Sequence, residues 1–174
     1  MISLARILVA TDFGEASASA LAYGRAFAAM FGAKLDVLHV VDHVAARAVG
    51  ADGFLMASAD AQDDAEEEAR GRLDRLVDEA APGAAARAVI RVASAPAHAI
   101  IAYAREADVD LIVMGTHGRG RMTHLLMGSV AERVVRLAPC PVLTVRSPER
   151  EFVQPDALTT ALLLQRGVDW RPGD

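Results

Sequence analysis

The sequence lacks the features that several large classes of protein require. It has a single cysteine, Cys140, so no disulfide can form within the chain, and this favours a reducing compartment. The net charge of −5 argues against a general nucleic-acid-binding protein, because such proteins carry an excess of basic residues. No apolar run approaches the ~20 residues that span a bilayer, and no signal peptide is evident at the start. These absences predict a cytoplasmic protein.

The residues that are abundant predict a globular domain. Of the 174 residues, 53% are hydrophobic and 24% are charged, which is enough apolar surface for a substantial core. The acidic run 63–68 is interpreted as a solvated helix face with arginines nearby. Cys140 stands just before an apolar run, and no activating base is close in the sequence. We therefore interpret it as a half-buried packing residue and not as a redox group.

Short apolar runs alternate along the chain with longer amphipathic stretches. The apolar runs predict strands at Ile7–Ala10, Leu35–Val41, Ala88–Val92, Leu111–Met114 and Val142–Val145. The amphipathic stretches predict helices at Glu15–Phe31, Asp60–Glu79, from Pro96 to about Ala107, and over Ser129–Leu137. Strands joined by helices require right-handed parallel crossovers. The fold class is therefore α/β, a single-domain, doubly wound, five-stranded parallel sheet with helices on both faces.

Two segments fall outside this regular alternation. Residues 43–59 contain Gly50 and Gly53 and are too long for a simple connection, so they are interpreted as a lid or an irregular surface excursion. The residues from 147 to 174 follow the last predicted strand. They include the apolar stretch Ala157–Leu164, which predicts a short helix docked on the domain or on a partner.

A glycine-rich loop follows the fourth predicted strand. It reads Gly115-Thr116-His117-Gly118-Arg119-Gly120-Arg121, and a helix opens later with Gly128-Ser129. Glycines let the backbone approach an anion, and the N–H groups at a helix start can bind it. Arg121-Met122 replaces the Lys-Ser/Thr of a Walker A motif, and the third glycine of a dinucleotide fingerprint is missing. The loop therefore predicts a phosphate site with its own spacing.

Several residues of this site also have a purely structural interpretation. Ser129 and Glu132 have the spacing of a capping box, which can coexist with phosphate binding. Asp12, after the first strand, can bind a nucleoside or cap the next helix together with Glu15. Arg119 and Arg121 can attract phosphate or simply be solvated. No protein metal site is expected, because the histidines and Cys140 lack ligand spacing, and His39 is interpreted as a structural residue within a strand.

Three segments and the glycine spacing together resemble the universal stress protein family. The segments are Ile7–Phe13, Leu38–Asp42 and the stretch from Leu111 through Gly115-x2-Gly118-x9-Gly128-Ser129, and Ala138–Val145 matches the last turn and strand of the family. The resemblance covers residues 3–146 and assigns the chain to the ATP-binding branch. It implies the strand order 3-2-1-4-5 of an adenine nucleotide alpha hydrolase-like fold. It also implies residues 1–146 as the family domain and 147–174 as an extension.

The same resemblance implies the ligand, the site and the assembly. Asp12 would contact the nucleoside, the Val40 main chain would contact adenine, and the glycines with Ser129 would surround the phosphates of ATP carrying Mg²⁺. The expected site residues are Ala10, Thr11, Asp12, Val40, Met114, Gly115, Thr116, His117, Gly118, Arg119, Gly120, Arg121, Gly128, Ser129, Val130 and Ala131. A homodimer is expected through Val142–Val145. The expected function is a nucleotide-dependent stress-response module. A slow ATPase or phosphoryl-transfer enzyme is the alternative, although no catalytic base is assigned.

Overall fold

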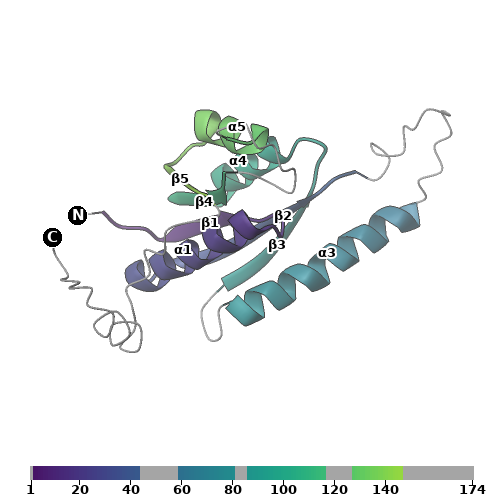
Figure 1. Cartoon of the computed structure of the whole chain (residues 1–174), viewed down its shortest axis with the longest axis horizontal. Coiled ribbons are helices and arrows are strands. Elements are labelled where there is room, and N and C mark those ends of the chain that lie inside the picture. The colour runs from purple at the N-terminus through teal and green to yellow at the C-terminus, as the bar shows by residue number, and fades with distance from the viewer. Residues whose placement is uncertain (1, 44–58, 81–85, 117–126, 147–174) are drawn as a thin grey trace, which may run out of the picture.

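The computed structural model describes residues 2–43, 59–80, 86–116 and 127–146 (Figure 1). Its strands are β1 (Arg6–Ala10), β2 (Lys34–Val41), β3 (Ala86–Val92), β4 (Leu111–Gly115) and β5 (Val142–Val145). Its helices are α1 (Glu15–Phe31), α3 (Ala59–Ala80), α4 (Pro96–Glu106) and α5 (Ser129–Leu137). All neighbouring strands run parallel, in the order β3-β2-β1-β4-β5. The predicted fold class and strand order are confirmed.

The element boundaries lie close to those that the sequence predicts. Helix α1 begins and ends at the predicted residues. At its C-terminal end, Gly32 adopts a left-handed conformation with φ 64°, and its N–H donates to Ala28 O. Strand β5 also has the predicted ends. Strand β3 begins at Ala86, two residues before the predicted start. Residues 44–58 and 147–174, which hold nearly all of the predicted insert and the whole extension, lie outside the described residues.

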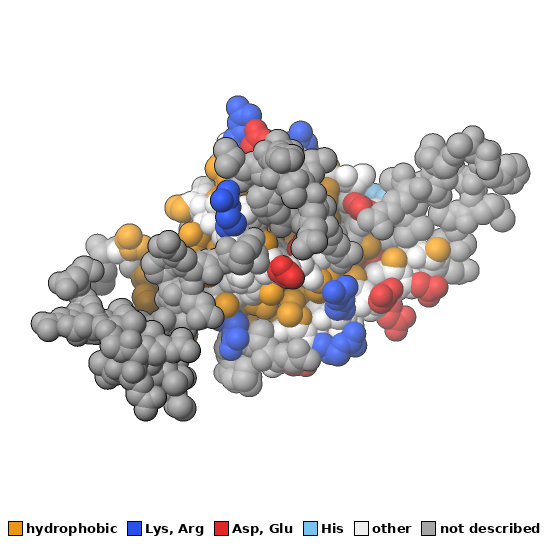
Figure 2. Space-filling model, viewed as in Figure 1, with side chains coloured by type: hydrophobic (Ala, Val, Ile, Leu, Met, Phe, Trp, Pro, Cys, Tyr) orange, Lys and Arg blue, Asp and Glu red, His pale blue; other side chains and the backbone are white. Residues whose placement is uncertain are grey.

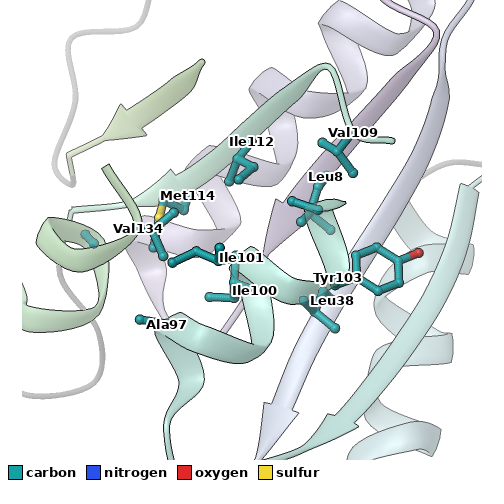
Figure 3. Packing of buried hydrophobic residues seen from close by; sticks show 13 residues of the cluster. Leu8, Leu38, Ala97, Ile100, Ile101, Tyr103, Val109, Ile112, Met114 and Val134 are labelled. Carbon is teal, nitrogen blue, oxygen red and sulfur yellow. The ribbon is translucent and has the colours of Figure 1, made fainter. Parts of the chain in front are cut away.

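One face of the sheet is covered by α4 and α5. Figure 3 shows Ile100 and Ile101 of α4 directed toward the sheet, beside Leu8 and Ile112 from the central strands. Val134 of α5 completes this cluster and is fully buried. Such close packing of large aliphatic side chains fixes the position of α5, and with it the position of the helix N-terminus.

The opposite face is covered by α1 and α3, which lie together on the other side of the sheet in Figure 1. Ile7 and Val9 of β1 point to this face, and the intervening Leu8 points to the other. Leu21 of α1 and Leu73 of α3 pack against them. Because both faces are covered, the central strands are apolar throughout, as parallel strands in α/β proteins usually are.

Two glycines in helices differ in what a side chain there would meet, and this gives a matched pair of predictions. A Cβ atom at Gly24 would lie 2.3 Å from Val9 Cγ2, so Gly24→Ala forces α1 away from β1. We expect this variant to lower the free energy of unfolding by about 1–3 kcal/mol. At Gly71 the nearest atom is Arg75 Nη1 at 3.7 Å, so Gly71→Ala is expected to raise it by about 0.5–1 kcal/mol. Urea unfolding of both variants measures the two changes, and equal shifts would contradict the described packing.

A buried carboxylate lies in the half of the sheet opposite the strand carboxyl ends. Asp36 of β2 is 2% exposed and accepts hydrogen bonds from Arg6 Nη1 at 3.2 Å, Arg87 Nε at 3.0 Å and the Tyr103 hydroxyl at 2.9 Å. Burial, followed by the bond to Asp36, raises the pKa of Tyr103. The bond to Asp36 also raises the pKa of Arg87. The network links β1, β2, β3 and α4 around the Asp36 carboxylate.

The surface of α3 confirms the interpretation of the acidic run. Asp63, Asp64, Glu67 and Glu68 are exposed, and Figure 2 shows acidic side chains along this helix on the right of the view.

Over the described part of the chain, no helix is both long enough and apolar enough to cross a membrane.

Candidate functional site

Strands β1 and β4 lie side by side at the centre of the sheet, where the strand order reverses. Ala10 at the end of β1 is opposite Met114 of β4, so the carboxyl ends of the two strands lie next to each other. The chain leaves β1 toward β2 on one side and leaves β4 toward β5 on the other. In doubly wound sheets, ligands bind in the crevice at this point. The predicted residues at both strand ends therefore meet at one place.

A tight turn follows β1 and fixes the position of Asp12. The Asp12 side chain accepts a hydrogen bond from Gly14 N–H at its Oδ1, at 3.0 Å. Phe13 between them has a φ of 64°, a left-handed conformation that is rare for a bulky residue. The N-cap of α1 is Gly14, with no side-chain bond. The alternative of Asp12 and Glu15 as a capping box is therefore wrong: the turn separates Asp12 from the helix start and uses its carboxylate locally.

Thr11 supports this turn from within the fold. Its hydroxyl accepts from Phe13 N–H at 3.0 Å and donates to Ser17 Oγ at 3.1 Å. Its N–H donates to Leu38 O, and its carbonyl lies 2.8 Å from His39 Nδ1. A carbonyl only accepts, so His39 Nδ1 carries a proton. This confirms His39 as a structural residue, and it gives Thr11 the role of holding Asp12 in place.

Strand β2 extends past the end of β1 and presents main-chain groups to the same crevice. Ala10 is opposite Leu38, and Leu38 O accepts from Thr11 N–H on the β1 side. Main-chain groups of alternate residues in a strand point to the same side, so those of Val40 also point toward β1. Beyond Ala10 the strand β1 has ended. The N–H and C=O groups of Val40 therefore point toward the space that follows β1.

The end of β4 is joined to the start of α5 by a direct hydrogen bond. Thr116 N–H donates to Val145 O at 2.8 Å, and Thr116 O accepts from Gly128 N–H at 2.7 Å. Thr116 and Gly128 therefore lie side by side, although eleven residues separate them in the sequence. Gly128 and the N-terminus of α5 are placed at the carboxyl end of β4, beside the crevice.

The first turn of α5 directs its N–H groups out of the helix. The N-cap is Gly128, with φ −71° and ψ 152° and no side-chain bond, and the first intrahelical bond runs from Glu132 N–H to Gly128 O at 2.9 Å. Glu132 pairs with Arg136 at 3.3 Å instead of reaching back. The capping-box alternative for Ser129 and Glu132 is therefore wrong. The N–H groups of Ser129, Val130 and Ala131 precede the first intrahelical bond, so they have no acceptor within the helix.

The packing of α1 against β4 leaves no room for a side chain at position 115. A Cβ atom there would lie 2.8 Å from Ala16 Cβ and 3.0 Å from the Ala16 carbonyl carbon. The absent side chain therefore allows α1 to approach β4, on the face away from α5. A role for the Gly115 backbone in phosphate binding stays a prediction, whereas Gly115 as a packing glycine is a structural finding.

The structure brings together most of the predicted site. Residues from the ends of β1, β2 and β4 and from the start of α5 meet at the carboxyl edge of the sheet: Ala10, Thr11, Asp12, Val40, Met114, Gly115, Thr116, Gly128, Ser129, Val130 and Ala131. The predicted loop residues His117, Gly118, Arg119, Gly120 and Arg121 lie outside the described residues. Within the ranges that the structure describes, no cluster of three or more His, Cys, Asp or Glu could hold a metal ion.

Sequence reasoning missed a stack of side chains beside this site. The ring centroids of Phe13 and His39 lie 4.3 Å apart. The guanidinium carbon of Arg72 lies over the Phe13 ring, 4.3 Å from its centroid. A cation over an aromatic face contributes about 0.5–2 kcal/mol. The stack joins β1, β2 and α3 and helps to hold Phe13 in its left-handed conformation. The residues are distant in sequence, and no local pattern signals their contact.

Cys140 fits its predicted packing role. The residue is half-buried and packs against the cluster beneath α4 and α5. Burial, followed by the charge of Asp110, raises the pKa of its thiol. A protonated thiol is a poor nucleophile, so the structure supports packing over redox chemistry.

Comparisons with known proteins agree with this arrangement. The sequence profile of the universal stress protein family matches residues 4–146. Universal stress protein MJ0531 of Methanocaldococcus jannaschii is 31% identical over 146 residues, which are 84% of this chain and 84% of that protein.

Two solved structures extend the agreement to three dimensions. The structure of MJ0577, from the same organism, has a TM-score of 0.72 at 28% identity and covers 86% of this chain and 100% of its own. A universal stress protein solved in complex with cAMP has a TM-score of 0.62 at 26% identity and covers 83% of this chain and 98% of its own. The strand order, the likeness to solved structures and the family profile lead to one conclusion: the chain belongs to the universal stress protein family.

Proposed function

We propose that the protein binds ATP in the crevice between the ends of β1 and β4 and acts as a cytoplasmic, nucleotide-dependent regulatory module in stress responses. The nucleoside lies beside Asp12 and the Val40 main chain. The phosphates lie at the start of α5, where the glycine loop returns, and they carry any Mg²⁺ with them. The Asp12 carboxylate accepts hydrogen bonds from ribose hydroxyls.

The observation that carries this proposal is the junction of Thr116 and Gly128. Their 2.7 Å hydrogen bond sets the N-terminus of α5 at the carboxyl end of β4. This helix start has no side-chain cap, so its first-turn N–H groups suit an anion. A helix start of this kind at a switch point is a common way to hold phosphate.

The nucleoside end of the site has separate support. Val40 directs both a donor and an acceptor toward the space beyond β1, which matches the adjacent acceptor and donor on the edge of adenine. A related protein was solved in complex with cAMP, whose base is also adenine. The proposal favours binding over catalysis, because it assigns Asp12 to the nucleoside, and Glu132 is paired with Arg136 on the surface.

The proposal also retains the expected homodimer. Strand β5 is an edge of the sheet and has only four residues, of which Val142, Leu143 and Thr144 are half-buried. An apolar edge strand is a template for pairing with another chain, so pairing of β5 with its copy would protect it.

Asp12→Asn tests the nucleoside end of the proposed site. The amide oxygen still accepts from Gly14 N–H, so the turn is kept, but the charge that binds ribose hydroxyls is lost. We expect the affinity for ATP and for adenosine to fall about 10-fold, the usual effect of losing one charged hydrogen bond. Titration calorimetry measures both affinities.

Inorganic triphosphate separates a local effect from a general one. Its affinity is expected to stay unchanged in Asp12→Asn, because it contacts only the phosphate end. Asp108→Asn is the matched control, since Asp108 is exposed at the opposite edge of the sheet and its φ of 49° suits asparagine. An unchanged affinity for adenosine in Asp12→Asn would remove Asp12 from the site.

A further inference from the structure

Helix α1 carries an apolar flank on the side toward β5. Tyr23, Phe27 and Phe31 follow one another at the spacing of a helical turn, with ring centroids 6.5 Å and 6.4 Å apart. Met30 beside them is 74% exposed, and Phe31 is 37% exposed. Only Glu15 and Arg25 are charged among the 17 residues of the helix. An outer helix of a soluble domain normally has a charged outer face.

The orientation of α1 places this flank over the edge of the sheet. Gly24 faces Val9 of β1, and Ala16 faces Gly115 of β4. Residues 23, 27 and 30 lie on the same side of the helix as Ala16 and therefore point toward β4 and β5. Leu143 of β5 is half-buried and packs into the cluster that includes Tyr23 and Phe27. The flank and Leu143 form an apolar shelf, which we call the β5 shelf.

On this face of the sheet, α3 covers the strands on the far side of α1, whereas no helix among the described residues covers the β5 shelf. Helix α3 packs on β2 and β3, while α1 packs mainly on β1 and β4 and makes fewer contacts with β2 and β5. Figure 1 shows α1 and α3 on this side of the sheet. A third helix beyond α1 would complete the layer.

The chain leaves the sheet beside this shelf. Val145, the last residue of β5, is 4% exposed in the same cluster as Tyr23 and Phe27. The residues after 146 lie beyond the span that the family profile matches, so the common family domain does not account for them. They include Ala157–Leu164, whose sequence Ala-Leu-Thr-Thr-Ala-Leu-Leu-Leu predicts a helix between Asp156 as N-cap and Gly167 beyond its end. Leu158, Ala161 and Leu162 share one side of such a helix.

We propose that the C-terminal segment 157–164 of the same chain packs on the β5 shelf as an added outer helix. About ten residues separate it from the end of β5, and they span up to ~35 Å when extended. Helix α1, with 17 residues, is only ~25 Å long, so the segment can reach Met30 and Phe31 at its far end. The leucines of the segment and the exposed side chains of Met30 and Phe31 are buried together, which stabilises both.

Hydrogen exchange of the full-length protein tests this docking. We expect amides of 157–164 to exchange at least tenfold more slowly than in an unstructured chain. Met30→Glu on the shelf and Leu162→Glu in the segment are each expected to remove this protection, because each buries a charge in the contact. Val135→Glu is the matched control: Val135 is 45% exposed on α5, on the other face of the sheet, and its variant should keep the protection.

Two further readouts identify the occupant. Trp170 is the single tryptophan and lies just beyond the segment, so its fluorescence reports docking without a label. In a Cys140→Ser background, Met30→Cys and Leu162→Cys are expected to form a disulfide within one chain under oxidising conditions. Unprotected amides in the wild type would overturn the proposal. A disulfide that forms only between chains would assign the shelf to a second copy and would also overturn it.

Discussion

The Gly128→Val variant is expected to lose ATP binding by about 100-fold or more, equivalent to about 2.8 kcal/mol, while the domain stays folded. Gly128 has φ −71° and ψ 152°, an extended conformation that valine adopts readily. The fold therefore tolerates the side chain at this backbone conformation. The phosphate does not, because the branched Cβ occupies the approach to the first-turn N–H groups of α5. Calorimetric titration with Mg-ATP and thermal unfolding measure the two effects separately.

Gly115→Ala is expected to lower stability and to have little direct effect on ATP binding, the opposite of what we expect for Gly128→Val. Its added Cβ would lie 2.8 Å from Ala16 Cβ and close to the α1 backbone, so stability falls by about 1–3 kcal/mol. Its effect on the nucleotide is indirect, because the added methyl faces away from α5. A folded Gly128→Val variant that binds ATP as the wild type does would contradict the phosphate assignment, and one that unfolds would contradict the expected tolerance of the fold. Gly118→Val is expected to weaken binding in the same way as Gly128→Val.

The Asp36→Ala variant is expected to lower the free energy of unfolding by about 2–4 kcal/mol. Asp36 is 2% exposed and holds Arg6, Arg87 and Tyr103 at distances of 2.9–3.2 Å. Removal of one member of a buried charged network costs about 3–5 kcal/mol. We expect a value toward the lower end, because the Arg87 side chain is 58% exposed and can be solvated instead. Urea unfolding, fitted with a common slope, measures the change.

Glu106→Gln is the control for this prediction. Glu106 pairs with Arg91 at 2.8 Å, but the side chains are 60% and 44% exposed. Solvent screens such a pair, and its loss should change stability by less than about 0.5 kcal/mol. Because Asp36 lies away from the crevice, ATP affinity at low temperature should be unchanged in both variants. Similar stability losses in the two would show that burial of Asp36 does not set the strength of the network.

The regular elements could be predicted because their signals are local. The apolar runs of the strands and the Gly32 that ends α1 are visible in the sequence, and the structure places them as predicted. The helix starts at Glu15, Pro96 and Ser129 were also predicted, but the way in which two of them are capped was not. Two pairs of polar residues with capping-box spacing, Asp12 with Glu15 and Ser129 with Glu132, proved misleading. A left-handed turn at Phe13 precedes the N-cap Gly14 in the first case, and Gly128 takes the N-cap position in the second. Bulky residues with positive φ have no sequence signal, and the surrounding contacts decide them.

The place where the strand ends meet was predictable from the sequence, whereas the contacts of the individual residues there were not. The glycine spacing and the strand ends identify which segments meet, because parallel strands bring their carboxyl ends to one edge. The direction of the Val40 main-chain groups depends on the register of β1 and β2, which the sequence does not reveal. Gly115 shows the same limit: it fits the motif, but α1 packing already requires it to be glycine.

The nucleotide content of the protein as purified tests the proposed function most directly. The full-length chain is purified without added nucleotide and denatured, and any released nucleotide is identified by chromatography. Binding in the crevice predicts released ATP in amounts approaching one per chain, and a thermal shift on adding Mg-ATP to emptied protein. Released ADP in place of ATP would favour the slow ATPase alternative. The absence of any nucleotide, together with no thermal shift on adding Mg-ATP, would contradict the proposed function.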